Sequence, residues 1–89
     1  MVSVTHLRAL RRRYHITLDQ IAFHAGLSGQ YISRAELGEI AATPRLEAQM
    51  TSAVESIISA RKMEIQALEE EYMTYKGCLL GKEEHADEQ

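Results

Sequence analysis

The sequence predicts an all-α protein in which a small helical domain is followed by one long C-terminal helix. Apolar residues recur at spacings of three and four along most of the chain, and no stretch alternates apolar and polar residues. The single proline, Pro44, precedes a long stretch without a helix-breaking residue. With 89 residues, 45% of them hydrophobic, the chain suffices for one packed core and an appendage.

The first helix is expected to start near residues 3–5. Leu7, Leu10 and Tyr14 mark its apolar face by their spacing. Its polar face carries four arginines, which are Arg8, Arg11, Arg12 and Arg13. A short turn at residues 14–16 follows.

The second helix has the clearest start signal in the chain. Thr17, with Gln20 three residues later, forms a capping box, and Gly26 ends the helix. A third helix starts after only two further residues, with Ser28 as its N-cap, and ends near residues 37–38. The two short helices are therefore separated by a single tight turn.

The long helix opens at Pro44 and is predicted to run to Gly77. One apolar face in its first half is suited to closing the core, and it consists of Leu46, Met50, Ala53 and Ile57. A second stripe repeats at four-three spacing as a heptad seam, formed by Val54, Ile58, Arg61, Ile65, Leu68, Tyr72, Tyr75 and Leu79. Either a second copy or the chain's own front half must cover this seam. Because eight positions exceed what three short helices can cover, we expect a homodimer through Ile58, Ile65, Leu68, Tyr72, Tyr75 and Leu79.

Charge is divided unevenly along the chain, although the net charge is only -3. Residues 1–46 carry six cations and three anions, whereas residues 47–89 carry four cations and ten anions. This asymmetry predicts a basic working surface joined to an acidic part with a different role.

Composition and spacing exclude several classes of protein. The sequence has no apolar run long enough to span a membrane, and residues 1–6 lack the apolar region of a secretory leader, so that we expect neither a membrane span nor secretion by that route. The single cysteine, Cys78, is typical of a reducing compartment. We therefore expect a cytoplasmic protein. The four histidines are not spaced as a metal set, and Cys78 has no evident base partner. The sequence also shows no glycine-rich phosphate loop and no paired carboxylates in a likely cleft. Neither an enzyme, a cofactor nor a bound metal is expected.

Residues 18–37 have the pattern of a helix-turn-helix. This motif needs a small residue in its first helix, a turn residue that tolerates positive φ, and a branched apolar residue in its second helix. Ala22, Gly26 and Ile32 meet these requirements at spacings of four and six.

With the flanking matches, residues 7–50 resemble the Cro and phage-repressor family of helix-turn-helix DNA-binding domains, also called the xenobiotic-response-element family. The matching positions are Leu7 to Arg11, Thr17 to Ala22, Gly26 to Ser28, Tyr31 to Glu36 and Gly38. The resemblance implies a lambda-repressor-like domain whose third helix lies in the major groove of double-stranded DNA. It also implies that Arg11 pairs with Glu36, which ties the first helix to the end of the third.

By their positions in this motif, Gly29, Gln30 and Arg34 are expected to face the bases, with Tyr31 and Ser33 on the flanks. Thr17 and Ser28 are expected to present helix N-termini to phosphates, and Arg12 or Arg13 to add positive charge.

These observations lead to a first hypothesis of a sequence-specific transcriptional regulator, a repressor that binds a pseudo-palindromic site as a homodimer. On this hypothesis residues 1–58 bind DNA, residues 59–80 extend the long helix and dimerise, and residues 81–89 form a disordered acidic tail. Families of this kind are frequent on phages and mobile elements.

Three positions depart from the family pattern, namely Leu18, Leu37 and Glu39. Leu18 cannot make the phosphate contact that a glutamine commonly makes there, and Glu39 would repel the DNA backbone. These departures motivate an alternative hypothesis, a protein-interaction module such as an antitoxin or a phage-encoded inhibitor, whose acidic C-terminal helix binds a partner protein.

Overall fold

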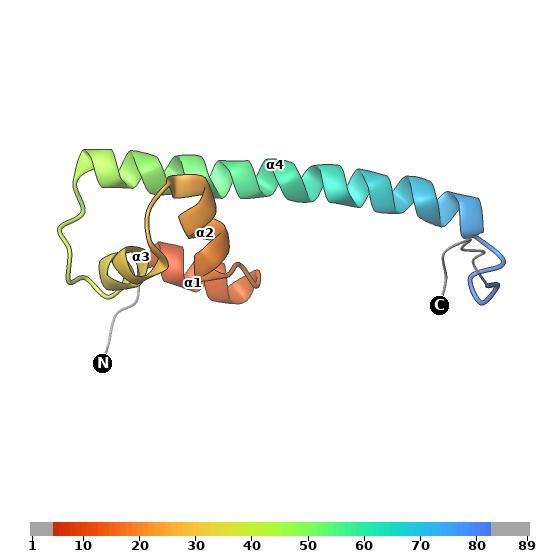
Figure 1. Cartoon of the computed structure of the whole chain (residues 1–89), viewed down its shortest axis with the longest axis horizontal. Helices are drawn as coiled ribbons and strands as arrows, with labels where there is room; N and C mark the ends of the chain where they lie inside the picture. Colours follow the sequence, from red (N-terminus) through yellow and green to blue (C-terminus); the bar gives the residue numbers. More distant parts are fainter. Residues whose placement is uncertain (1–4, 83–89) are drawn as a thin grey trace.

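The computed structural model describes residues 5–82, and this part of the chain is folded into four helices without a strand (Figure 1). The helices are α1 (His6–Arg13), α2 (Leu18–Ala25), α3 (Gly29–Glu36) and α4 (Pro44–Tyr75). In Figure 1 the three short helices gather along the N-terminal half of α4, and the remainder of α4 projects alone. The predicted all-α fold with one long C-terminal helix is confirmed.

We call residues 5–61, which comprise α1 to α3 and the first half of α4, the head. Residues 62–75, the projecting half of α4, are called the arm. The molecule extends 53 Å along its longest axis, whereas its other two extents are 28 and 22 Å. The arm accounts for this elongated shape (Figure 1).

Local capping explains where the short helices begin. Thr5 Oγ1 accepts a hydrogen bond from the Arg8 amide and caps the start of α1. Thr5 falls within the predicted start at residues 3–5, of which residues 3 and 4 lie outside the described residues. In the predicted capping box Thr17 Oγ1 accepts from the Gln20 amide at 3.0 Å, while Gln20 Oε1 accepts from the Thr17 amide at 2.9 Å. Each cap satisfies amide groups that the helix itself leaves without a partner.

The turn between α2 and α3 is also set by local chemistry. Gly26 ends α2 with φ of 71°, a left-handed conformation that costs glycine little. Ser28 Oγ then accepts from the Tyr31 amide and starts α3. Gly26, Leu27 and Ser28 are thus the whole connection between two eight-residue helices.

The core of the head lies between α2, α3 and α4. Ile21 of α2 and Ile32 of α3 are completely buried. Around them pack Ile16 and the face of α4 predicted to close the core, Leu46, Met50, Ala53 and Ile57, all of which are buried. Burial of these side chains is the main stabilising contribution to a domain without a disulfide.

Arg61 joins α4 to the turn between α1 and α2. Its guanidinium donates to the carbonyl oxygens of Tyr14 at 2.7 Å and His15 at 3.1 Å. The turn is tight, since His15 has a positive φ of 57°. The charged interruption of the predicted seam therefore has an intramolecular role at the boundary of head and arm.

Each residue of the arm is exposed, so the rest of the described chain buries none of them. α4 ends at Tyr75 rather than at the predicted Gly77, so that Leu79 of the predicted seam lies beyond the helix. The predicted disordered tail, residues 81–89, falls outside the described residues except for its first two positions. Among the helices described, none combines the length and apolar character needed to cross a bilayer.

Candidate nucleic-acid interface

The outward face of α3 carries the side chains predicted to face DNA bases. Ile32, Ala35 and Glu36 point into the head, and helical periodicity places Gln30 and Arg34 on the opposite side. Both of these side chains are exposed. α3 therefore offers an amide, which can donate and accept, and a guanidinium, which donates, on one accessible surface.

The other predicted α3 residues lie around this face. Tyr31 is on its flank and 38% exposed, whereas Ser33 and Gly29 are half-buried. Gly29 lies close to the start of α2, because a Cβ at this position would be 3.8 Å from the Leu18 Cβ and 3.9 Å from the Asp19 carboxylate. The first turns of α2 and α3 are therefore neighbours.

This proximity brings two helix N-termini together, with Thr17 and Ser28 exposed as their N-caps. The partial positive charge at each N-terminus favours an anion nearby, and the capping hydroxyls can still donate their own protons. Asp19, in the first turn of α2, opposes this positive potential. A phosphate would benefit most on the side of the pair away from Asp19.

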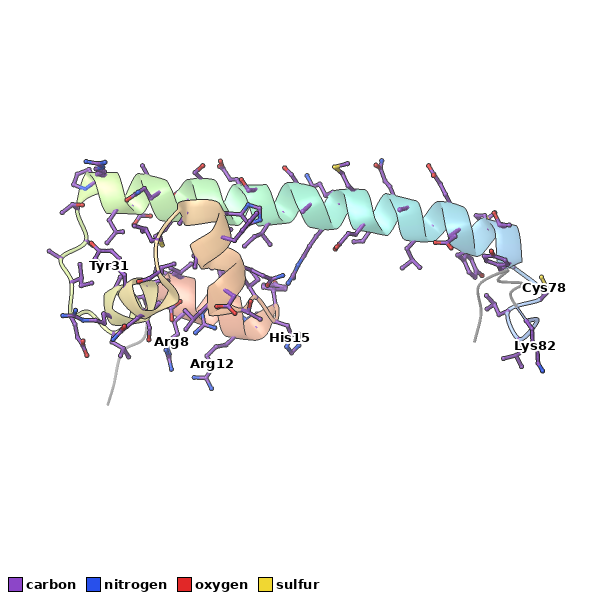
Figure 2. All side chains as sticks on the ribbon, in the orientation of Figure 1. Arg8, Arg12, His15, Tyr31, Cys78 and Lys82 are labelled. Atoms are coloured by element: carbon purple, nitrogen blue, oxygen red, sulfur yellow. The ribbon has the colours of Figure 1, made fainter. Side chains whose placement is uncertain are left out.

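Positive charge on α1 extends this surface. Arg12 and Arg13 are exposed and form no ion pair within residues 5–82. Figure 2 shows Arg12 projecting from α1 away from α4. The two arginines are consequently available to a phosphate.

A buried ion cluster holds α3 against α1. Glu36 is 2% exposed, and Arg11 binds its carboxylate in a bidentate manner, with Nε–Oε2 at 2.8 Å and Nη2–Oε1 at 3.0 Å. Arg11 Nη1 also donates to the Ile16 carbonyl oxygen. Arg8, which sequence reasoning did not assign to this cluster, places a second guanidinium 3.4 Å from the same carboxylate. The spacing of Arg8 three residues before Arg11, on one helix face, is the signal that indicates this contact.

Arg34 is engaged within the chain in this structure. Its Nε lies 3.4 Å from the Glu39 carboxylate, and both side chains are more than half exposed. An exposed pair of this length is weak. Glu39, one of the departures from the family pattern, thus competes with any anion for the guanidinium that points outward from α3.

Two exposed apolar residues of the head were not assigned to a site. Leu37, at the C-terminal end of α3, is 57% exposed, and Phe23 of α2 is 82% exposed, with its ring edge-on to that of His24. The position of Phe23 off the apolar face of α2 is the sequence signal that predicts this exposure.

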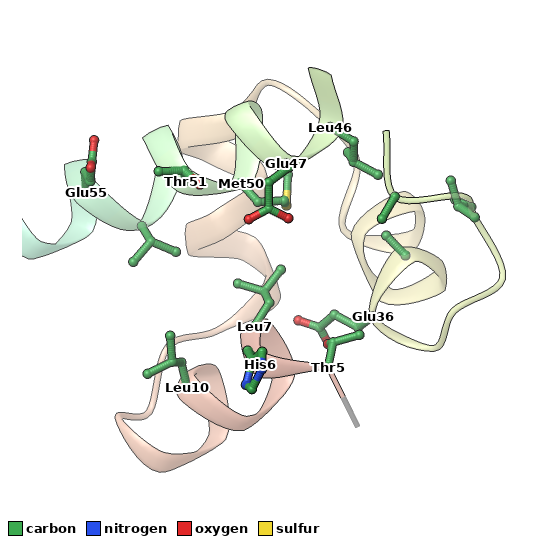
Figure 3. A pocket seen from close by; sticks show the side chains of 14 residues that line it. Thr5, His6, Leu7, Leu10, Glu36, Leu46, Glu47, Met50, Thr51 and Glu55 are labelled. Atoms are coloured by element: carbon green, nitrogen blue, oxygen red, sulfur yellow. The ribbon is translucent and has the colours of Figure 1, made fainter. Parts of the chain in front are cut away.

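An apolar groove of about 470 Å³ lies between α1, the end of α3 and α4 (Figure 3). Its apolar walls include Leu7, Leu10, Ala35, Ile40, Met50 and Val54. The groove lies among residues other than those predicted to face DNA. No group of three potential metal-ligating side chains occurs among the residues that the structure describes.

Comparison with known proteins gives no relative: no family model, curated protein or solved structure matches the chain. The exposed residues of α1 and α3 and their geometry therefore remain as the guide to function.

Proposed function

We propose that this protein is a sequence-specific DNA-binding transcriptional regulator of the Cro and phage-repressor type. In this proposal the pair α2–α3 is a helix-turn-helix, α3 enters the major groove, and a homodimer represses by occupying a pseudo-palindromic promoter site. The observation that carries the proposal is the pairing of two capped eight-residue helices across Gly26, of which the second presents Gln30 and Arg34 outward.

The interface divides its work between phosphates and bases. Arg12, Arg13 and the adjoining N-termini of α2 and α3 supply phosphate contacts, which provide affinity but carry little sequence information. Gln30 is suited to adenine, whose N6 and N7 it matches with its amide, and Arg34 to guanine O6 and N7. Sequence discrimination therefore falls to these two residues.

Two ion pairs have opposite effects on this interface. The buried Arg11–Glu36 pair fixes the angle of α3 relative to α1, so it preorganises the surface without touching DNA. The exposed Arg34–Glu39 pair must open before Arg34 contacts a base. The Glu39 carboxylate also repels DNA phosphates, which predicts a low affinity of the protein for nonspecific DNA.

The test is binding to DNA enriched by in-vitro selection from random sequence. Gln30→Ala and Arg34→Ala are each expected to weaken binding to the selected site about tenfold or more, because each removes a bidentate base contact. Gln66→Ala, which removes an exposed glutamine from the arm, is the matched control and is expected to bind as the wild type does. Equal binding by all four proteins would exclude α3 as the reading helix.

A second candidate function, a protein-interaction module, is favoured by the apolar side chains exposed along the arm. Ile65 is 58% exposed and Leu68 65% exposed. Light scattering on the purified protein separates the two functions. A dimer supports the regulator, whereas a monomer that forms a stoichiometric complex only with another protein supports the module.

A further inference from the structure

The bare face of the arm continues the face of α4 that the head buries. Met50 and Leu68 are eighteen residues apart, which is five turns at about 3.6 residues per turn, and so are Ile57 and Tyr75. Met50 and Ile57 are buried in the core, whereas Leu68 and Tyr75 are exposed. A partner that covers this face of the arm therefore approaches from the side of α4 on which the head lies.

This position of the head restricts how a second copy can pair. In a parallel pair both heads lie at the same end of the pairing helices, each on the face turned towards the partner, and they compete for the same space. In an antiparallel pair the heads lie at opposite ends. The partner's arm then runs along the seam and reaches the edge of the head, near Arg61 and Ile58.

We propose that a second copy of this chain covers the arm in antiparallel orientation, with Ile65 of one copy opposite Leu68 of the other. This inference rests on the self-association included in the proposed function, but not on DNA binding. In this register Ile58 faces Tyr75 of the second copy. The same register sets Arg61 opposite Tyr72 of the second copy. The Tyr72 ring then makes a cation–π contact with the Arg61 guanidinium, which in its own chain donates to the carbonyl oxygens of Tyr14 and His15.

The charges beside the seam give a net attraction only in this orientation. Glu55, Lys62, Glu69 and Lys76 recur every seven residues along one flank with alternating sign. Antiparallel pairing sets Lys62 opposite Glu69 and Glu55 opposite Lys76, each twice by symmetry. On the other flank it sets Glu64 near Glu71, also twice, and this repulsion offsets part of the gain.

Parallel pairing has no such surplus of attraction. It sets Glu64 against Glu69 and Glu71 against Lys76, so that attraction and repulsion cancel. It also sets Arg61 opposite its own copy within the seam. In the antiparallel pair Leu79 and Leu80, exposed beyond the end of α4, lie towards the head of the second copy, which carries the apolar groove beside Val54.

One substitution distinguishes the two orientations by the sign of its effect. Glu69→Lys turns two attractive contacts into repulsive ones in the antiparallel dimer, which we expect to raise the dimer dissociation constant about tenfold. In a parallel dimer the same change relieves repulsion by Glu64 and lowers the constant. Glu70→Lys, on the outer side of the arm, introduces the same charge away from the seam and is the control.

The double variant Lys62→Glu, Glu69→Lys restores both contacts with reversed sign, and we expect it to dimerise as the wild type does. Sedimentation equilibrium on the full chain without DNA measures all four proteins. Tighter association of Glu69→Lys, failure of the double variant to recover, or a monomeric wild type at millimolar concentration would each overturn the proposal. Since this measurement contains no DNA, it distinguishes a failure of dimerisation from a failure of the proposed DNA binding.

Distances between spin labels give an independent measurement. In a Cys78→Ser background, cysteines introduced at Ala67 or Thr74 lie seven residues apart on the same outer side of the arm. Antiparallel pairing predicts that the labels at position 74 are separated along the helix axis by about 20 Å more than those at position 67. Equal separations at the two positions would show a parallel pair and contradict the proposal.

Discussion

The head and the arm share one continuous helix, and the same side of that helix has opposite surroundings in the two regions. Met50 in the head is 8% exposed, whereas Leu68, five turns further along, is 65% exposed. In the head, α2 and α3 bring Ile21 and Ile32 to this side of the helix; in the arm, no residue of the described chain does so. An apolar stripe therefore indicates that a surface is to be covered, but not which element covers it.

The head depends on its buried charges as well as on its apolar core. Glu36→Ala leaves Arg11, which is largely buried, without its carboxylate, and we expect the free energy of unfolding to fall by about 3 kcal/mol. Urea denaturation followed by circular dichroism measures the change. Glu70→Ala in the arm, an exposed acid that forms no ion pair within residues 5–82, is expected to change stability by less than about 0.5 kcal/mol. Similar losses for both variants would remove the distinction between the two regions.

In the proposed dimer the arm is covered by a second copy rather than by residues of its own chain. Leu68→Glu puts two charges into the centre of the proposed seam, and we expect the dimer dissociation constant to rise about a hundredfold. Met63→Glu makes a matched change on the opposite side of the arm, where Met63 is 70% exposed, and is expected to leave dimerisation unaltered. If both substitutions act alike in sedimentation equilibrium, the seam is not the paired surface.

The boundary between the regions is held by one side chain. Arg61→Ala removes two hydrogen bonds from the guanidinium to the α1–α2 turn, and we expect a loss of about 1 kcal/mol in stability. Hydrogen exchange at residues 14–16 should rise together with this loss. Arg61→Lys retains the positive charge but cannot make both hydrogen bonds with the bidentate geometry of a guanidinium, and we expect it to retain only part of the stability. Unchanged exchange in Arg61→Ala would mean that the turn needs no support from α4.

The smallest expected effect concerns the surface of the head. Glu39→Gln removes the anion beside Arg34, and we expect affinity for a selected DNA site to rise about threefold. The slope of log affinity against log salt concentration should change little, because no phosphate contact is added. Glu47→Gln, an exposed acid on α4, serves as the control. Weaker binding by Glu39→Gln would contradict a competing role for Glu39.

The elements of the fold were predictable because their signals are local. The Thr17 capping box, Gly26 and Pro44 each determine a helix boundary through contacts within four residues, and all three boundaries agree with the structure. The predicted end of α4 was two residues too late. Gly77 is the obvious helix breaker in the sequence, but the helix already ends at Tyr75.

The long-range contacts were less predictable. Helical periodicity is sufficient to place Gln30 and Arg34 on the outer side of α3. It cannot show that Arg61 reaches a turn 46 residues earlier in the chain, because this contact depends on how the helices pack. The spacing of Arg8 and Arg11 puts both arginines on one face of α1, but the packing of α3 against α1 decides that both reach the Glu36 carboxylate. The Arg34–Glu39 contact depends in the same way on the path of the chain after α3.

The most direct test of the account is in-vitro selection from random DNA, with the wild type and with Leu68→Glu. If the head reads DNA and the arm joins two heads, the wild type enriches two inverted half-sites, whereas Leu68→Glu enriches a single half-site of the same sequence with much lower affinity. Selection of no sequence by the wild type would contradict DNA reading by the head. Selection of the same paired half-sites with equal affinity by both proteins would contradict the role of the arm.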